Sequence, residues 1–155
     1  MSRLNKREFT LYALLCDDEA IYVGTCEKDR FEKRFLEHKT GKGSQFTSAY
    51  KYGTIEKIYA ENHDEEDVHD RISMETNLTF CLMKSFGYKN VRGGQGAWKN
   101  VILKKDPTLN EEHIDRWADE PVEDIIEEIF NIIHEKYPKS KLVDEFFFRK
   151  FNLYN

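Results

Sequence analysis

FTLYALLC (residues 9–16) and AIYVGT (residues 20–25) are two runs rich in aliphatic and aromatic residues, separated by a short polar stretch that begins at Asp17. Two such runs around a short polar connection favour a β-hairpin. From Lys28 to Lys39 the apolar residues recur at helical spacing, and Gly41 ends that pattern. A hairpin that leads directly into a helix predicts a domain of the α/β class.

Further elements follow this helix along the chain. Residues 41–53 mix glycine, serine, lysine and aromatic residues, and predict a basic loop or a short helix. Residues 54–62 predict a third strand, with odd- and even-numbered side chains on opposite faces. Residues 64–86 predict a long helix, opened by acidic residues that suit the positive end of its dipole and closed by Gly87. Residues 90–94 (NVRGG) predict a turn.

The last third of the chain is mainly helical by pattern. Residues 98–105 predict a short strand or an extended passage. Helices are predicted at residues 109–119, from Pro121, and from about residue 140 to residue 151. We therefore expect an α/β fold: a small antiparallel sheet of three or more strands flanked by helices, formed by residues 1–106. Residues 107–155 are expected to be an acidic helical extension that packs on this domain or forms a dimer contact.

The net charge of −5 is unevenly distributed. Residues 1–100 carry as many basic as acidic side chains, and six of their acids lie within residues 61–70. The rest of this part is therefore locally basic, as phosphate binding requires. Residues 101–155 account for the whole negative total.

Three cysteines, Cys16, Cys26 and Cys81, show no CxxC pairing, so the sequence favours thiols over a disulfide framework or a zinc ribbon. The chain has no long apolar run and no apolar stretch behind its basic N-terminus that would suit a signal peptide. We therefore expect a soluble, intracellular protein, cytoplasmic or nuclear, without membrane contact.

Glu75 interrupts an otherwise core-facing stripe of the predicted long helix. The stripe contains Val68, Ile72, Thr79, Leu82 and Phe86. A buried carboxylate is costly unless it is paired or bound to a metal, although a stripe along the exposed edge of the helix would equally explain Glu75. Two strand tyrosines, Tyr12 and Tyr22, and an arginine on the next helix accompany it. Together they supply what phosphodiester hydrolysis needs: a carboxylate for a hard cation, a cationic fork for phosphate and a weak acid for the water proton.

The same residues, in this order, resemble the GIY-YIG nuclease family over about residues 8–95. The matching segments are Leu11-Tyr12-Ala13, Tyr22-Val23-Gly24, Phe31-Glu32-Lys33-Arg34-Phe35, Glu75 and Asn90. The first segment departs from the family pattern, because Thr10-Leu11-Tyr12 keeps only the tyrosine. The resemblance implies an endonuclease that hydrolyses phosphodiester bonds in nucleic acid with one Mg²⁺ or Mn²⁺ ion, and it favours DNA over RNA as the substrate.

The resemblance also implies a role for each matching residue. Tyr12 would be the general base or a ligand of the attacking water, and Tyr22 would bind water or phosphate. Arg34 would bind the scissile phosphate and offset charge in the transition state. Glu75 would be the metal ligand. Asn90 would hydrogen-bond near the site, although an asparagine at this position could equally form the turn.

His38 is a sixth candidate, because it follows Arg34 by four residues on the same helix face, where family members carry histidine or tyrosine. Basic residues that flank these positions are candidates for nucleic-acid binding: Arg30, Lys39, Lys42, Lys51 and Arg92. Each of them could equally be a solvated surface residue. Aromatic side chains at Phe46, Tyr50 and Tyr52 could stack on bases or anchor the loop to the core.

Two other classes of function remain open at this point. One is a nucleic-acid-binding module that kept the fold but lost turnover. The other is an interaction protein whose acidic helical tail binds a partner or a second copy of the chain. The choice between DNA and RNA, the cleavage specificity and the oligomeric state lie beyond the sequence.

Overall fold

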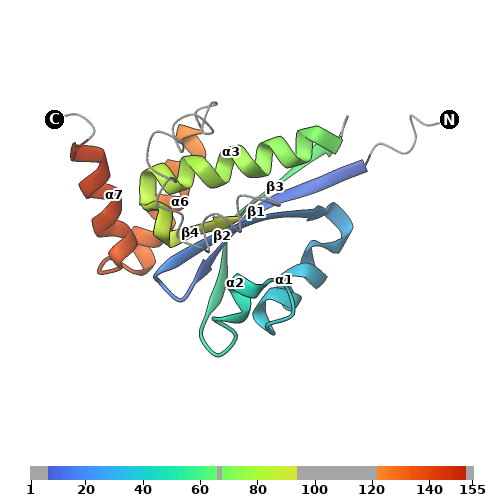
Figure 1. Ribbon diagram of the computed structural model, residues 1–155, viewed down its shortest axis with the longest axis horizontal. Coiled ribbons are helices and arrows are strands. Elements are labelled where there is room, and N and C mark those ends of the chain that lie inside the picture. The colour runs from blue at the N-terminus through green and yellow to red at the C-terminus, as the bar shows by residue number, and fades with distance from the viewer. Residues whose placement is uncertain (1–6, 66–67, 94–121, 153–155) are drawn as a thin grey trace.

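The computed structural model describes residues 7–65, 68–93 and 122–152, and these residues form a four-stranded sheet with helices on both faces (Figure 1). The strands are β1 (Arg7–Cys16), β2 (Ala20–Glu27), β3 (Ile55–Glu65) and β4 (Val91–Gly93), in the order β3-β1-β2-β4. β1 pairs antiparallel with both β2 and β3, whereas β4 pairs parallel with β2. The predicted α/β fold and the hairpin are confirmed.

Helices cover the two faces of the sheet unequally. The helices are the 3₁₀ turns η2 (Lys28–Arg30) and η3 (Tyr88–Asn90), and the α-helices α1 (Phe31–Lys39), α2 (Gln45–Ser48), α3 (Val68–Phe86), α6 (Glu123–Lys136) and α7 (Lys141–Asn152). Figure 1 shows α3 running along one face of the sheet, with α1 and α2 on the opposite side and α6 and α7 near the C-terminal end. The sheet is thus a divider between a short-helix layer and a long-helix layer.

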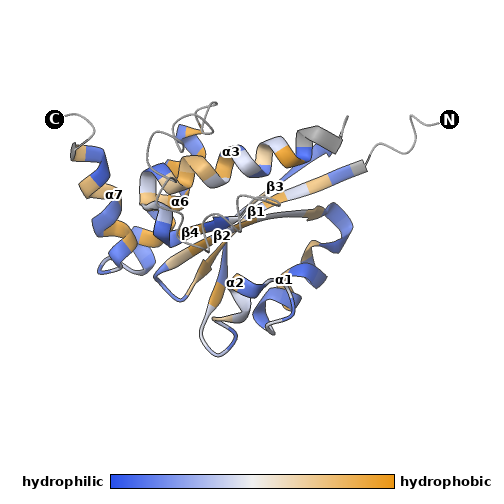
Figure 2. Ribbon diagram, viewed as in Figure 1, coloured by the Kyte–Doolittle hydropathy of each residue, from blue (hydrophilic) through white to orange (hydrophobic). Residues whose placement is uncertain are grey.

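Alternating side chains of the hairpin supply one core to each layer. On β1, Leu11, Ala13 and Leu15 belong to the core beneath α3, whereas Tyr12 and Leu14 belong to the core beneath α1 and α2. This division is what period-2 side-chain alternation dictates for a sheet covered on both faces. Figure 2 shows the apolar residues concentrated in the strands and along α3, while α1 is largely hydrophilic.

The C-terminal helices contribute to the larger core. Ile129 and Ile133 of α6 and Leu142 of α7 are fully buried in the same cluster as Phe86 of α3. α3 is therefore covered by the sheet on one side and by α6 and α7 on another, which explains why its second half buries more residues than a single stripe. Phe148 of α7 is exposed at 63%. The dimer contact and the division at residue 106 stay predictions.

Three local expectations were wrong. The predicted turn at residues 90–94 contains β4, a parallel strand of three residues, so the sheet is mixed rather than wholly antiparallel. The predicted helix from residue 64 begins only at Val68, because β3 continues to Glu65. The strict alternation within residues 54–62 is broken by a β-bulge. Residues 98–105 and 109–119 lie outside the described part of the chain.

The bulge lies at Ile58, which has no partner on β1, whereas Lys57 pairs with Leu14 and Tyr59 pairs with Ala13. An extra residue on one strand reverses the phase of the side chains beyond it. Ile58 and Tyr59 are consequently both buried in the core beneath α3.

No helix among the described residues is long and apolar enough to cross a membrane. The thiols of Cys16, Cys26 and Cys81 are buried and form no disulfide.

Candidate active site

Tyr12 lies at the centre of the face covered by α1 and α2. Its side chain is only 1% exposed, and its hydroxyl oxygen lies 2.9 Å from Nε2 of His38. Burial raises the pKa of Tyr12 well above the ordinary value, and the nearby Tyr22 raises it further, while the positive charge of Arg34 lowers it. Tyr12 is therefore a protonated phenol at neutral pH, with its hydroxyl hydrogen-bonded to an imidazole.

His38 is fully buried in the last turn of α1. Its Nδ1 atom lies 2.9 Å from the hydroxyl oxygen of Thr47, on α2. Burial, together with the positive charge of Arg34, lowers the pKa of His38 to about 4. The imidazole is therefore neutral at physiological pH, so that one ring nitrogen is a donor and the other an acceptor.

Tyr22 lies on β2, on the same face of the sheet, and is partly exposed. Its ring centroid is 5.0 Å from that of His38, and its ring stacks on Phe46 at 6.1 Å. Burial raises the pKa of Tyr22 and the negative charge of Glu75 raises it further, whereas the Ser44 hydroxyl and Arg34 lower it. Tyr22 thus lies within electrostatic reach of both the carboxylate and the guanidinium.

Arg34 points from α1 towards the loop before α2. Its Nη2 atom donates a hydrogen bond of 2.9 Å to the carbonyl oxygen of Gly43, and its Nη1 atom lies 3.7 Å from Glu37. The side chain is 33% exposed. One edge of the guanidinium is thus fixed by the protein, while the charge acts on both tyrosines.

Glu75 belongs to α3, on the opposite face of the sheet from the tyrosines, and is 5% exposed. The Thr25 hydroxyl donates a hydrogen bond of 2.7 Å to Oε2 of Glu75, and Nε of Arg71 donates to the Thr25 oxygen at 3.1 Å. Thr25 lies on β2 beyond the three residues that pair with β4, which are Ile21 to Val23. Glu75 therefore reaches β2 where β4 no longer covers its edge, and comes within electrostatic reach of Tyr22.

Asn90 and Arg92 have contacts that stabilise the backbone. The side-chain nitrogen Nδ2 of Asn90 donates a hydrogen bond of 2.8 Å to the carbonyl oxygen of Phe86. This hydrogen bond caps the C-terminus of α3. Phe86 and Glu75 are eleven residues apart, a rise of roughly 16 Å along a helix. Nη1 of Arg92 donates to the carbonyl oxygens of Tyr88 and Val91, both at 2.8 Å. These contacts support a structural role for both residues.

The other predicted basic residues lie on the surface. Arg30, Lys39, Lys42 and Lys51 are all exposed. Lys42 belongs to the loop between α1 and α2, and the Lys51 ammonium lies 5.2 Å from the centre of the Tyr52 ring. They are consequently accessible to an anionic polymer.

The three aromatic residues of the basic segment have different environments. Phe46 stacks on Tyr22 and packs against Tyr50, with ring centroids 5.6 Å apart in the second pair. Tyr52 is 93% exposed. Phe46 and Tyr50 therefore anchor the segment to the core, and only Tyr52 is presented to a partner.

Two polar partners of the candidate residues were missed in the sequence, Thr25 and Thr47. Strand alternation places Thr25 on the same face of β2 as Ile21 and Val23, and this face points into the core. Glu75 likewise occupies a core-facing position on its helix. Two polar residues at core-facing positions on neighbouring elements are a signal for a buried hydrogen bond. Ser44 is the N-cap of α2 and accepts from the Thr47 backbone amide at 3.0 Å. The pattern Ser-x-x-Thr indicates this cap, but no sequence signal indicates that it would meet His38.

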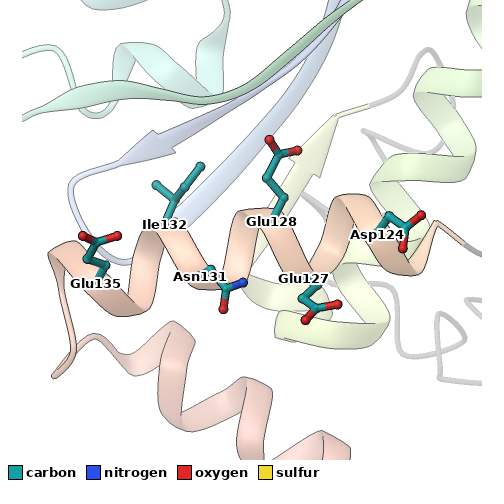
Figure 3. Close-up of a pocket in the computed structure, with 6 residues that line it drawn as sticks. All are labelled: Asp124, Glu127, Glu128, Asn131, Ile132 and Glu135. Atoms are coloured by element: carbon teal, nitrogen blue, oxygen red, sulfur yellow. The ribbon is translucent and has the colours of Figure 1, made fainter.

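A shallow hollow of about 450 Å³ lies elsewhere, along α6. Its lining residues are Asp124, Glu127, Glu128, Asn131, Ile132 and Glu135. Figure 3 shows these side chains spread along the helix rather than converging on one point. Among the described residues, no three histidine, cysteine, aspartate or glutamate side chains cluster closely enough to hold a metal ion by themselves.

Comparison with known proteins gives one partial relative. A UPF0213 protein of Fusobacterium nucleatum is 39% identical over 51 residues, which is 33% of this chain and 49% of that protein. UPF0213 proteins are GIY-YIG-like, so this partial match agrees with the family that the motifs resemble. The match spans about half the length of that relative. No protein-family model matches the chain, and no solved structure matches it.

Proposed function

We propose that this protein is a metal-dependent endonuclease that hydrolyses phosphodiester bonds in nucleic acid. The observation that carries the proposal is the hydrogen bond of 2.9 Å between the Tyr12 hydroxyl and the neutral imidazole of His38, beside Arg34 and Tyr22. Any hydrogen-bonding group would satisfy the hydroxyl of a purely structural tyrosine. Here the partner is an imidazole, which can act as a base, and a guanidinium suited to phosphate lies next to the pair.

Tyr12 and His38 together supply a route for the proton of the attacking water. Tyr12 is protonated at neutral pH, so its oxygen can accept the water proton only as its own proton leaves. Nε2 of His38 lies in hydrogen-bond reach, and it can accept this proton in the tautomer that leaves Nε2 unprotonated. A proton that moves from water to the Tyr12 oxygen while the phenolic proton moves to His38 avoids a free phenolate, and general base catalysis of this kind typically contributes about 10²- to 10⁴-fold in rate.

Arg34 and Tyr22 would bind the phosphate. The guanidinium of Arg34 keeps one edge on the Gly43 carbonyl, which orients the planar fork before the substrate arrives. A donor that is already oriented costs little reorganisation when charge develops in the transition state. Tyr22 lies beside Ser44 and Arg34 on one side and Glu75 on the other, so its hydroxyl suits a phosphate oxygen or a bound water.

The carboxylate of Glu75 fits a Mg²⁺ or Mn²⁺ ion. A magnesium ion prefers oxygen ligands, keeps several waters and needs only one or two carboxylates. Glu75 supplies one, already oriented by the hydrogen bond from Thr25. The ion would act as a Lewis acid towards the phosphate oxygens.

The substrate class follows from the exposed cations around this site. Arg30, Lys39, Lys42 and Lys51 are exposed basic residues, which would attract the phosphates of a nucleic acid. We propose DNA before RNA as the substrate, in keeping with the family resemblance.

A cleavage panel tests the proposed function. The full-length chain is incubated with single-stranded, duplex and branched DNA and RNA, with Mg²⁺, with Mn²⁺ and with chelator. Cleavage of at least one substrate that needs the divalent ion is the expected result. Binding of the same substrates without cleavage at any metal concentration would overturn the proposal and leave a binding module.

A further inference from the structure

A chain of hydroxyl groups continues from His38 away from the proposed reaction centre. Nδ1 of His38 lies 2.9 Å from the Thr47 hydroxyl oxygen, which in turn lies 2.8 Å from the Ser44 hydroxyl oxygen. His38 and Thr47 are both 0% exposed. The backbone of Gly43 lies against the Nδ1 side of the ring, where an added Cβ would overlap the imidazole. The only partner within hydrogen-bond distance of Nδ1 in the described part of the chain is thus Thr47.

The positive charge of Arg34 favours one direction for the hydrogen bond between Tyr12 and His38. Arg34 acts on the Tyr12 hydroxyl through its positive charge. A hydroxyl beside a cation favours the orientation in which its oxygen faces the cation, and this leaves its proton for Nε2 of His38, 2.9 Å away. An Nε2 atom that accepts a hydrogen bond carries no proton, so the proton of the neutral ring resides on Nδ1.

The hydrogen bonds of Thr47, on the other side of His38, favour the same direction. The Thr47 oxygen lies 3.4 Å from the Ser44 carbonyl oxygen, to which it can only donate, and 2.8 Å from the Ser44 hydroxyl. Threonine in a first helical turn commonly donates to a preceding carbonyl. With its proton directed to Ser44, the Thr47 oxygen presents lone pairs to His38 and accepts from Nδ1.

We propose that Thr47 is a positioning residue that holds His38 in the Nδ1-protonated tautomer, leaving Nε2 free to take the proton of Tyr12. The inference deepens the proposed function, on which its catalytic meaning rests, but the tautomer itself does not depend on any activity. Without Thr47, the ring would gain more by placing its proton on Nε2 and donating to Tyr12. His38 could then no longer accept the phenolic proton.

The experiment measures the tautomer directly. In the ¹⁵N-labelled full-length protein, long-range ¹H–¹⁵N spectra distinguish a protonated from an unprotonated ring nitrogen, and His38→Gln identifies the His38 signals among the five histidines. The wild type is expected to show a protonated Nδ1 and an unprotonated Nε2. The opposite assignment in the wild type would overturn the proposal without any variant at Thr47. The proposal therefore stays testable even if substitutions at Thr47 fail to fold.

Three variants separate the role of Thr47 from general packing. Thr47→Val keeps the shape and removes the acceptor, and is expected to move the proton to Nε2 in most molecules. Thr47→Ser restores the hydroxyl and is expected to restore the wild-type spectrum. Thr40→Val is the matched control, because the Thr40 hydroxyl donates to the carbonyl oxygens of Leu36 and Glu37 at the exposed end of α1 rather than to the imidazole of His38. A Thr47→Val protein with the wild-type tautomer would overturn the proposal.

Tyr12→Phe tests whether the tyrosine sets the tautomer instead. If Thr47 sets it, removing the phenolic hydroxyl leaves Nδ1 protonated; a shift of the proton in Tyr12→Phe would assign the control to Tyr12 and contradict the inference. On a substrate that the wild type cleaves, Thr47→Val should lower kcat by about tenfold or more, with KM little changed and rescue by Thr47→Ser. If the wild type cleaves nothing, the proposed function fails, whereas the spectra still decide the tautomer.

Discussion

A methyl group on Gly24 would lie 2.5 Å from the hydroxyl oxygen of Tyr12. The two residues are cross-strand partners on β1 and β2, and the tyrosine ring lies over the glycine. Gly24 therefore provides the space that lets a large phenol lie flat against the sheet and reach His38.

Gly24→Ala should consequently displace the Tyr12 hydroxyl. We expect a loss of roughly 1 to 3 kcal/mol in the free energy of unfolding, as for other overpacked sites. Cleavage should fall by a larger factor than stability alone explains, because the hydrogen bond of 2.9 Å to His38 cannot survive a shift of the ring. Urea unfolding and cleavage rates measured on the same preparation check this. A fully active Gly24→Ala protein would contradict the role given to the Tyr12–His38 pair.

Arg34→Ala should lower the cleavage rate by roughly two to three powers of ten, since loss of one electrostatic stabiliser of a transition state typically costs about 3 to 4 kcal/mol. Lysine should rescue little, because it lacks the planar fork that binds both Gly43 and phosphate. Arg30→Ala is the matched control: Arg30 is exposed, so its loss should raise KM in a salt-dependent manner and leave kcat unchanged. Equal kcat for the two variants would remove Arg34 from the mechanism.

Glu75→Gln should abolish cleavage while the fold and the nucleic-acid affinity persist. A neutral amide is a poor ligand for a hard dication, yet its oxygen can still accept the hydrogen bond from Thr25. The metal-free protein should therefore change its free energy of unfolding by no more than about 1 kcal/mol. Thermal melts with chelator and with Mg²⁺, beside binding and cleavage assays, separate the outcomes. Wild-type cleavage by Glu75→Gln would place the metal elsewhere.

His38 should make stability depend on pH between about 4 and 6.5. Burial beside Arg34 holds its folded-state pKa near 4, below the ordinary value of 6.5. The unfolded chain therefore binds more protons in this window, so stability is complete above it and is lost as pH falls through it, by up to about 3 kcal/mol. Urea unfolding at several pH values should show a shallower slope for His38→Gln.

Ile133→Ala should destabilise the protein by about 2 to 5 kcal/mol, because it opens a cavity in the core that α6 shares with α3. Ile132, the next residue, is only partly buried, so Ile132→Ala should cost clearly less. Urea midpoints compare the two. Similar small losses would mean that α6 adds little to the stability of the domain.

The elements with strong periodicity were predictable, and short or irregular ones were not. The hairpin, α1 and α3 follow from residues that repeat every two or every three to four positions, and Gly87 ends α3 with φ of 94° as expected of a C-terminal glycine. β4 has only three residues, too few for a period, and its pairing with β2 is a contact between segments far apart in sequence. The bulge at Ile58 is likewise invisible until the partner strand is known.

The candidate site was predictable in its residue types but not in its connections. Tyr12, Tyr22, Arg34 and His38 could be named because the segments that contain them resemble the motifs of the GIY-YIG nuclease family. That His38 lies between Tyr12 and Thr47 depends on how α2 folds back onto α1, which no local pattern specifies. Asn90 and Arg92 show the converse, since their chemistry suits a site while their contacts support the backbone.

The sheet separates two layers of unequal strength. Of the residues that the structure describes, nineteen form the buried cluster under α3 and the C-terminal helices, but only seven form the cluster under α1 and α2. Regions with little apolar burial open locally at a lower free energy than the rest of a protein. Arg34, His38 and Thr47 all belong to the layer with the smaller cluster, so we expect one local opening event to move them away from Tyr12 together. The Tyr12–His38 pair, which we propose handles the proton, would then be separated and reassembled while the remainder of the protein stays folded.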